Sequence, residues 1–247
     1  WSWHKPYCQL SGETQWKMQP TTSSVWKTYL GFDRTTLSLD TDGRTLDLGE
    51  SNLYLNSVVK GSAKGGLNWF AGVAGSWVWE TIDGALVEAD RYRHRMGELH
   101  LKVKVSKNLS SAMKATLGAE GFLRHVCVDY RSTTDYRYSA DTHLPAFFAE
   151  TQFRLSRHLF AEASLRSEYT SGAHRWSVLP RLLLNYRPTT SWLFTLAAGQ
   201  YTQEMTDTVQ AKSHETLRPS TASHYIAGAQ YRFGKTNLRL EAYYKRY

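Results

Sequence analysis

The sequence predicts an all-β protein, specifically an antiparallel up-and-down transmembrane β-barrel. Segments of about ten residues alternate apolar and polar side chains, so their period is about two residues rather than the helical 3.6. The connections between these segments alternate between short and long. In outer-membrane barrels, lipid-facing and lumen-facing residues alternate along each strand, and tight turns and longer loops lie at opposite ends. Both patterns therefore favour this fold class.

Composition is the third observation, since it fits membrane-crossing strands and not membrane-crossing helices. The 247 residues are 41% hydrophobic, and the mean hydropathy is −0.49. The sequence contains no run of about 18 apolar residues, the length that a membrane-spanning helix needs. A transmembrane strand needs only about 9–11 residues, roughly half of them apolar. A low mean hydropathy is therefore expected of a barrel.

The first 96 residues are the less regular part of the chain. In order, the elements predicted there are a loop or incomplete strand (1–24), a strand (25–33), a hairpin around Asp42-Gly43 (37–48), a strand (52–60), a strand within 65–80, and a polar outer loop (81–95). No linker separates these elements from the rest, so residues 1–247 are expected to be part of one barrel domain.

The alternation of apolar and polar residues predicts eight strands in series within residues 97–247. Their ranges are 97–105, 114–124, 146–155, 159–168, 176–186, 192–198, 225–233 and 237–245. In the first of them, Leu99 and Leu101 alternate with His100 and Lys102. A slip of one residue would turn the charged set toward lipid, so the register is strongly specified.

The connections indicate how the barrel is oriented. The short ones (107–110, 156–158, 187–191 and 234–236) all share one side, because successive strands reverse direction. The other connections are residues 130–143, 171–174 and 204–220. By the usual asymmetry of outer-membrane barrels, the short turns are periplasmic and the others extracellular. Aromatic residues near strand ends are expected to form interfacial girdles: Trp192, Tyr231, Phe233, Tyr169 and Tyr201.

Charge and cysteine content exclude several classes of partner. The net charge is +8, but the 30 Lys and Arg are scattered rather than gathered into a stripe. This favours a basic lumen or a lipopolysaccharide-facing surface and argues against nucleic acid. The nine histidines show no metal-ligand spacing. Cys8 and Cys127 are expected to be unpaired, with a disulfide as the alternative. We predict no metal and no cofactor.

Residues 217–233 (LRPSTASHYIAGAQYRF) and 238–245 (LRLEAYYK) resemble the barrel of TonB-dependent outer-membrane receptors. Four upstream stretches are similar to consecutive strands of the same barrels, in the same order: FFAETQFRL (147–155), LRSEY (165–169), LPRL (179–182) and AGQY (198–201). The chain departs from the family pattern at Arg218, where Lys is common, and at Ser220, where an acidic residue is usual. Neither change should disturb the start of a strand.

This resemblance covers about residues 97–247 and implies a larger architecture. Receptors of this class have about 22 strands around a plugged lumen, so the chain is expected to supply roughly half a barrel. Residues 1–6 do not resemble a signal peptide. We therefore expect a piece of a longer precursor, with the plug and the TonB-contacting segment upstream and further strands after Tyr247.

The resemblance implies a function in the bacterial outer membrane. The parent protein would bind a scarce nutrient (a ferric siderophore, a cobalamin-like cofactor, an oligosaccharide or a peptide) and import it into the periplasm. Its partners would be outer-membrane lipid, the plug of the same parent chain, the TonB complex acting through that plug, and the nutrient. Whether a surface lipoprotein caps the barrel is left open.

Two predicted extracellular loops carry the candidate ligand-binding residues. They mix rings that can stack with Arg forks that can hold an anionic group. The first loop offers Tyr130, Arg131, Asp135, Tyr136, Arg137, Tyr138 and His143. The second offers Glu204, Asp207, Lys212, His214, Glu215 and Arg218. Solvated loop side chains are the alternative interpretation for each of them.

Charged residues on the polar faces of the predicted strands are expected to face the lumen. They are Glu150, Arg154, Glu162, Arg166, Glu168, Arg181, Arg239 and Glu241. We interpret them as cross-strand ion pairs or plug contacts rather than as a substrate path.

Three alternatives remain at this stage. A lipid or peptide hydrolase would need a catalytic constellation at one rim. Ser139, Asp141 and His143 are close in sequence, but Gly-x-Ser-x-Gly and HExxH motifs are absent. We therefore predict that the protein is not an enzyme. A small self-closed porin or structural barrel of about 10–12 strands is the second alternative. A soluble β-sandwich is the third, and the regular alternation of connection lengths argues against it.

Overall fold

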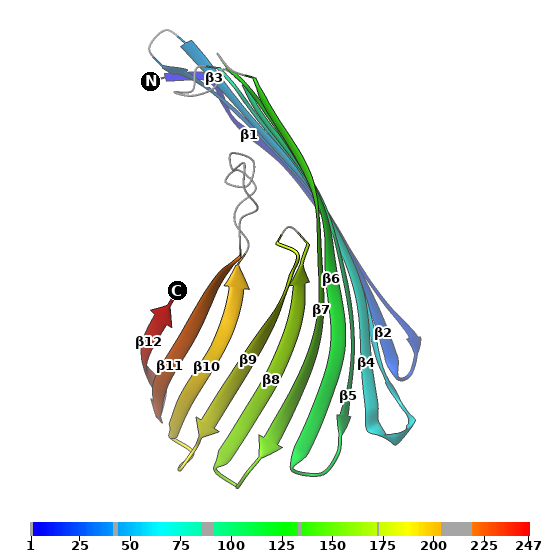
Figure 1. Ribbon diagram of the computed structural model, residues 1–247, viewed down its shortest axis with the longest axis vertical. Coiled ribbons are helices and arrows are strands. Elements are labelled where there is room, and N and C mark those ends of the chain that lie inside the picture. Colours follow the sequence, from blue (N-terminus) through cyan, green and yellow to red (C-terminus); the bar gives the residue numbers. More distant parts are fainter. Residues whose placement is uncertain (1, 42–43, 85–90, 133–134, 172, 204–218) are drawn as a thin grey trace.

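The computed structural model describes residues 2–41, 44–84, 91–132, 135–171, 173–203 and 219–247. They form one sheet of twelve strands, each hydrogen-bonded to the next one in the sequence. Every pair is antiparallel, and the sheet curves into a trough whose two edges are β1 and β12 (Figure 1). The predicted all-β, up-and-down antiparallel fold is confirmed.

The bounds of the strands are β1 (Ser2–Thr21), β2 (Ser24–Thr41), β3 (Arg44–Ala63), β4 (Leu67–Asp83), β5 (Arg91–Asn108), β6 (Met113–Arg131), β7 (Tyr136–Arg154), β8 (Leu159–Thr170), β9 (Arg175–Tyr186), β10 (Trp192–Gln203), β11 (Ser220–Phe233) and β12 (Thr236–Arg246). A 3₁₀ turn, η1 (Lys64–Gly66), joins β3 to β4. The eight strands predicted after residue 96 correspond to β5 through β12.

The predicted strands were too short for β2, β3, β5, β6 and β7. Strands β1 to β7 have 17–20 residues and β8 to β12 have 11–14. The long strands continue well above the others in Figure 1. The periodic segment ends where the lipid-facing apolar residues end, but backbone pairing continues beyond it.

Residues 1–24 were expected to be a loop or an incomplete strand, and this was wrong. They contain β1, which pairs with β2 along nearly its whole length. Its register shifts between Trp3 and Lys5, between Lys5 and Cys8, and between Met18 and Thr21. A bulge adds a residue to one strand and moves the side chains beyond it to the other face. These shifts interrupt the period of two only near the ends of β1, because the register is unbroken from Cys8 to Met18 and Leu10, Trp16 and Met18 alternate there with polar residues.

The connections at the lower end in Figure 1 are short, as predicted. They are residues 22–23, 64–66, 109–112, 155–158, 187–191 and 234–235. Gly234 has a φ of +54°, a conformation that favours glycine in tight turns. The opposite end carries the other connections, including residues 171–174, whose bounds match the prediction. The predicted outer loop at 81–95 is shorter than expected, because β4 extends to Asp83 and β5 begins at Arg91.

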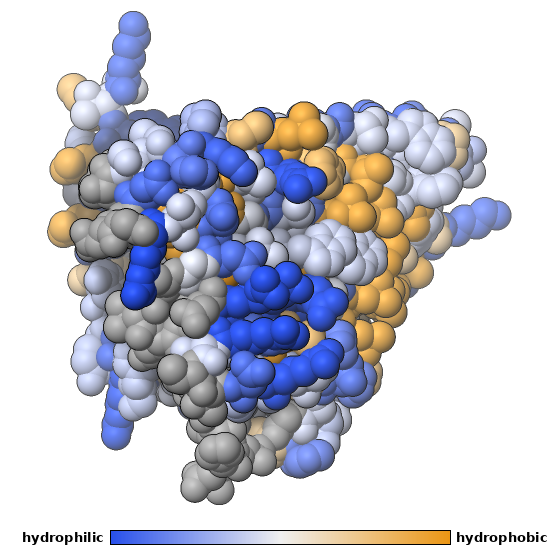
Figure 2. Space-filling view, turned by 90° about the horizontal axis from the view of Figure 1, so that it is seen from above, coloured by the Kyte–Doolittle hydropathy of each residue, from blue (hydrophilic) through white to orange (hydrophobic). Residues whose placement is uncertain are grey.

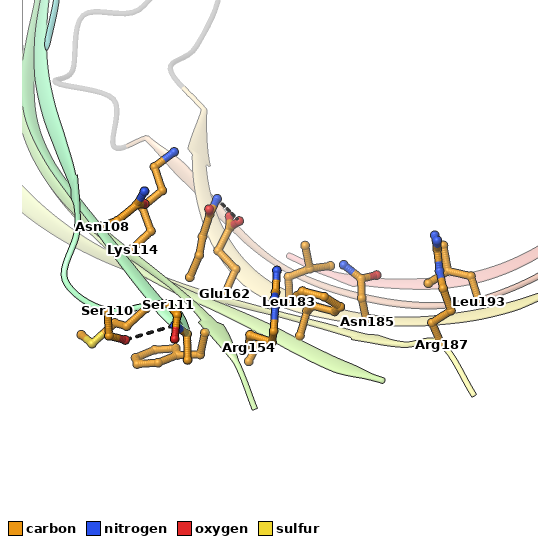
Figure 3. Close-up of a pocket in the computed structure, with 16 residues that line it drawn as sticks. Asn108, Ser110, Ser111, Lys114, Arg154, Glu162, Leu183, Asn185, Arg187 and Leu193 are labelled. Carbon is orange, nitrogen blue, oxygen red and sulfur yellow. Dashed lines mark hydrogen bonds between the residues drawn. The ribbon is translucent and has the colours of Figure 1, made fainter. Parts of the chain in front are cut away.

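Cross-strand partners in an antiparallel sheet point to the same face, so the pairing assigns each strand residue to one of two faces. Leu101, Leu117 and Leu182 lie on one face together with other aliphatic residues. The other face is polar, and Figure 3 shows Arg154, Glu162 and Asn185 of this face pointing into the trough. The concave face is therefore polar, and the convex face carries the apolar side chains.

Aromatic side chains bound the apolar band of the convex face. Trp69 and Trp79 of β4 are ten residues apart, and so are Trp176 and Tyr186 of β9. At about 3.4 Å per residue, ten residues extend about 34 Å along a strand. A strand tilt of about 40° reduces this to about 26 Å, which agrees with the apolar band of about 25 Å in outer-membrane barrels.

The girdle prediction was right for four residues and wrong for one. Trp192, Tyr231, Tyr169 and Phe233 lie on the convex face, where the ring centroids of Trp192 and Tyr231 are 4.5 Å apart. Tyr201 lies on the concave face, because its ring is covered by the Arg181 guanidinium at 4.4 Å.

Within the described residues, no helix is long and apolar enough to cross a membrane.

Candidate functional site on the concave face

The structure places all eight predicted lumen-facing charges on the concave face. Several have partners there. Arg166 Nε donates to Glu168 Oε2 at 2.8 Å, and Arg239 Nη2 donates to Glu241 Oε1 at 2.5 Å. Gln152 bridges the remaining carboxylates by donating to Glu150 at 3.2 Å and to Glu162 at 3.0 Å. Arg154 lies over the Phe160 ring at 5.5 Å. The two ion pairs thus join residues of the same strand, whereas Gln152 with Glu162 and Arg154 with Phe160 are contacts between β7 and β8.

The centre of the charged face is Glu120, which the sequence did not single out. Its carboxylate is only 9% exposed and receives the Lys102 ammonium at 2.7 Å and the Arg166 guanidinium. Arg166 also binds Glu168, which accepts a hydrogen bond from the Thr202 hydroxyl. This Glu120 network connects β5, β6, β8 and β10.

A small residue lets this network cross a strand. Ala146 of β7 lies between Glu120 and Glu168 in the register, and it is 1% exposed. Because its methyl group is short, Arg166 reaches over β7 to the β6 carboxylate. The alternation of Lys102 and Glu120 with apolar residues indicated their face, but only the strand order shows that they meet.

A cluster of tyrosines lies at the upper end of the concave face. The ring centroids of Tyr92 and Tyr130 are 5.0 Å apart, and those of Tyr130 and Tyr136 are 6.4 Å apart. Tyr138 is on the same face, two residues along β7. We call these four residues the tyrosine cluster. Beside it, His94 Nδ1 is 3.0 Å from Glu80 Oε2, and the His94 ring stacks on Tyr92 with the centroids 6.3 Å apart.

The predicted loop at 130–143 was wrong, because β6 extends to Arg131 and β7 begins at Tyr136. Only Asp135, among the candidate residues of this segment, lies between strands. Strand alternation then divides the candidates between two faces. Tyr130, Tyr136 and Tyr138 face the trough, whereas Arg131, Arg137 and His143 lie on the convex face. The tyrosines and these cations therefore do not form one site.

The candidates of the second loop lie outside the described residues: Glu204, Asp207, Lys212, His214, Glu215 and Arg218.

Ser139, Asp141 and His143 alternate along β7 on the convex face, where Asp141 Oδ1 is 2.8 Å from His125 Nδ1. None of the three lines the hollow at the lower end of the trough. Cys8 and Cys127 are both free, as expected.

The lower end of the trough contains an open hollow of about 720 Å³ (Figure 3). Its polar lining includes Lys114, Arg154, Glu162, Asn185 and Arg187. These side chains can hold a polar peptide segment or water, and they lie next to the short turns. Within the part of the chain that the structure describes, no three His, Cys, Asp or Glu residues could together hold a metal ion.

Comparison with known proteins agrees with this geometry. The chain matches the family model described as "TonB dependent receptor-like, beta-barrel" over residues 9–247. No curated protein matches the sequence. The fold is similar to that of the outer membrane transporter YddB from Escherichia coli, with 8% identity and a TM-score of 0.81, covering 97% of this chain and 40% of that one.

Two further solved structures are similar. The siderophore receptor PirA from Acinetobacter baumannii has 10% identity and a TM-score of 0.77, covering 97% of this chain and 43% of that one. The alcaligin outer membrane receptor FauA from Bordetella pertussis has 11% identity and a TM-score of 0.70, covering 96% and 43%. The chain thus spans less than half the length of each, and at these identities the similarity shows the fold.

Proposed function

This chain belongs to the TonB-dependent receptor-like β-barrel family, and from this premise we propose that it forms the nutrient-binding part of an outer-membrane importer. It lies in the bacterial outer membrane. The observation that carries the proposal is the trough itself, with a tyrosine cluster at the extracellular end and a charged wall below it. A nutrient is recognised by the upper part and passes along the lower part to the periplasm.

The tyrosine cluster supports recognition of a ring-containing or sugar-containing ligand. Its rings offer apolar faces and hydroxyl groups that donate and accept hydrogen bonds. Two of the three structures described above are named as receptors for siderophores or for alcaligin. A ferric siderophore is therefore the first nutrient class to test, followed by cobalamin-like cofactors, oligosaccharides and peptides.

The Glu120 network and the hollow near the short turns supply the surface for a plug. Charged pairs such as Arg166 with Glu120 and Glu168 can exchange partners with a polar domain inside the barrel. In this proposal the plug belongs to the same parent chain, and TonB acts on the plug rather than on these strands. The candidate residues of the 204–218 segment remain part of the proposal as extracellular ligand contacts.

The function is tested by deleting the gene that encodes the full-length protein. Uptake of ⁵⁵Fe is measured with a panel of purified ferric siderophores, and growth is measured with cobalamin, oligosaccharides or peptides limiting. The proposal expects one selective defect that a plasmid copy restores and that a protonophore reproduces in the wild type. Unchanged uptake of every nutrient, together with passive sugar permeation in liposomes, would instead identify a porin.

The tyrosine cluster yields a residue-level prediction. Tyr130→Ala removes the ring that contacts both Tyr92 and Tyr136, and we expect about tenfold weaker binding of the imported nutrient, or about 1.4 kcal/mol. Binding to the full-length protein is measured by quenching of tryptophan fluorescence. Tyr225→Ala, on the convex face, is the matched control and should bind as the wild type does. Equal weakening in both variants would contradict the assignment of the ligand to the concave face.

A further inference from the structure

The charged residues around the short turns at the lower end of the sheet are all basic. The segments that contain these turns and the adjoining strand ends are 15–28, 60–70, 104–117, 154–161, 185–195 and 230–238, and none of them contains Asp or Glu. They contain twelve Lys and Arg: Lys17, Lys27, Lys60, Lys64, Lys104, Lys107, Lys114, Arg154, Arg157, Arg187, Arg232 and Lys235. These residues are scattered in the sequence, but the up-and-down fold brings them to one end (Figure 1). Positive charge is therefore concentrated at the end that the short turns assign to the periplasm.

Four of these lysines lie on the concave face of the first five strands: Lys17 (β1), Lys27 (β2), Lys60 (β3) and Lys104 (β5). We call them the lysine site. Lys104 shares the concave face with Lys102, two residues away on β5. Phe70 of β4 pairs with Lys60 on one side and with Lys104 on the other, and Lys104 Nζ is 5.5 Å from the centre of the Phe70 ring. Seen from the upper end, hydrophobic side chains follow the sides of the molecule (Figure 2). The lysine site instead faces the trough, away from lipid.

The lysine site has no counter-charge among the described residues. Lys17 and Lys27 are directly opposite each other, an arrangement that destabilises an antiparallel pair. On the same face, the Glu13 carboxylate accepts a hydrogen bond from Tyr29 Oη at 3.0 Å, and Glu120 belongs to its own network. The four lysines are exposed, and the structure gives no ion pair between them and the described residues. A bound anion would reduce their mutual repulsion.

Beside these lysines, the concave face contains an open hollow of about 470 Å³. Its lining combines two of the lysines with an aromatic ring and small polar side chains: Lys60, Lys104, Phe70, Ser62, Asn68 and Ser106. Ser62 Oγ donates to Asn68 Oδ1 at 2.7 Å, which holds these two polar groups beside the lysines. Pockets for small molecules have volumes of about 300–1,000 Å³. The hollow is therefore large enough for a small solute.

The lining selects the chemistry of that solute. Lysine ammonium groups hold carboxylate and phosphate oxygens through charge-assisted hydrogen bonds, and the Phe70 ring offers an apolar surface to a carbon skeleton. We propose that the lysine site binds a small solute with carboxylate or phosphate groups, and that the imported nutrient carries such groups. The inference rests on the proposed import function and names the chemical class of the nutrient. A nutrient recognised in the upper part of the trough is then held at the lower end before its release to the periplasm.

The test measures citrate binding to the full-length protein and to its Lys60→Gln/Lys104→Gln variant, in a non-ionic detergent, by isothermal titration calorimetry. We expect at least about tenfold weaker binding in the variant, because each Gln removes one charge-assisted contact. Added salt should weaken binding to the wild type, because it screens exposed charges. The matched control, Lys107→Gln/Lys235→Gln, loses the same charge at the same end, from the convex face and from a turn. It should bind citrate as the wild type does.

Ligand variants identify the anionic group. Glucose 6-phosphate offers phosphate in place of carboxylate, and glucose offers neither and should not bind. The tighter of the two anions identifies the group that the site prefers. Three results would each overturn the proposal: no binding of either anion to the wild type, as when plug carboxylates fill the site; equal losses in both double variants; or glucose binding as tight as that of glucose 6-phosphate. Heat-modifiable migration shows whether the variants fold, and the two single substitutions carry the test if the double variant does not.

Failure of the lysine site and failure of the import function give different results. If the deletion strain loses uptake of a nutrient without carboxylate or phosphate groups, import stands and the assignment of the nutrient class is overturned. If citrate binds as expected but the deletion strain takes up every nutrient normally, the import function fails, and the assignment of the anion as the nutrient fails with it.

Discussion

Leu182→Arg is expected to lower the free energy of unfolding by about 2–4 kcal/mol, the cost of an arginine near the bilayer midplane on the lipid face of a barrel. Leu182 lies on the convex face of β9, roughly midway between Trp176 and Tyr186. Its cross-strand neighbours are Ala163 and Ala198. Neither offers a partner to a guanidinium, so the charge would be left in hydrocarbon.

Leu183→Arg is the matched control, since it places the same side chain one residue further along the same strand. Leu183 points into the trough and pairs with Glu162. There an arginine finds a carboxylate and a polar lumen, and the expected change is below about 1 kcal/mol. Both are measured by urea unfolding of the full-length protein in lipid vesicles, followed by heat-modifiable migration. Similar losses in the two variants would show that the faces are assigned wrongly.

Glu120→Ala is the second large expected effect, at about 3 kcal/mol, because removing one partner of a buried ion pair leaves the others unpaired. The carboxylate is 9% exposed. Its loss removes the anionic partner of the Lys102 ammonium and of one side of the Arg166 guanidinium. The same urea titration measures the change. Arg239→Ala removes a charge that is 66% exposed and paired only with Glu241 among the described residues, so it should cost less than about 1 kcal/mol.

A double-mutant cycle of Glu120 and Arg166 shows whether the two side chains stabilise the sheet together or independently. Glu120→Ala combined with Arg166→Ala should cost clearly less than the sum of the two single substitutions, because the second removes a charge that the first left unpaired. Strict additivity would mean that the two groups act independently, and the Glu120 network would then not stabilise the sheet as a unit.

Much of the fold could be predicted from alternation alone. The period of two is clear where Leu99 and Leu101 alternate with His100 and Lys102. In a strand with this period, every second side chain lies on the same face. For the same reason the eight predicted lumen-facing charges all lie on the concave face. The prediction failed for β1, whose central residues from Cys8 to Met18 do alternate but whose register shifts near both ends.

The candidate site was less predictable, because most of the segment 130–143, which was predicted to be a loop, belongs to β6 and β7. Tyr130 and Arg131 are adjacent in the sequence, and both were predicted to contact the ligand from one loop. Once both belong to β6, adjacency puts them on opposite faces. The tyrosine then joins Tyr92 and Tyr136 in the trough, and the arginine lies on the convex face. No signal in the sequence showed that pairing continues beyond the apolar band.

By itself, then, the sequence determined the class of fold, the face of each alternating residue and the end at which the short turns lie, because these follow from the chemistry of neighbouring positions along one strand. Only the tertiary structure decided that Arg166 reaches Glu120 across Ala146, and that Arg93 and Arg137 flank Asp129. Such partners lie on different strands, and backbone hydrogen bonds set their register. That register becomes visible only when the sheet is assembled.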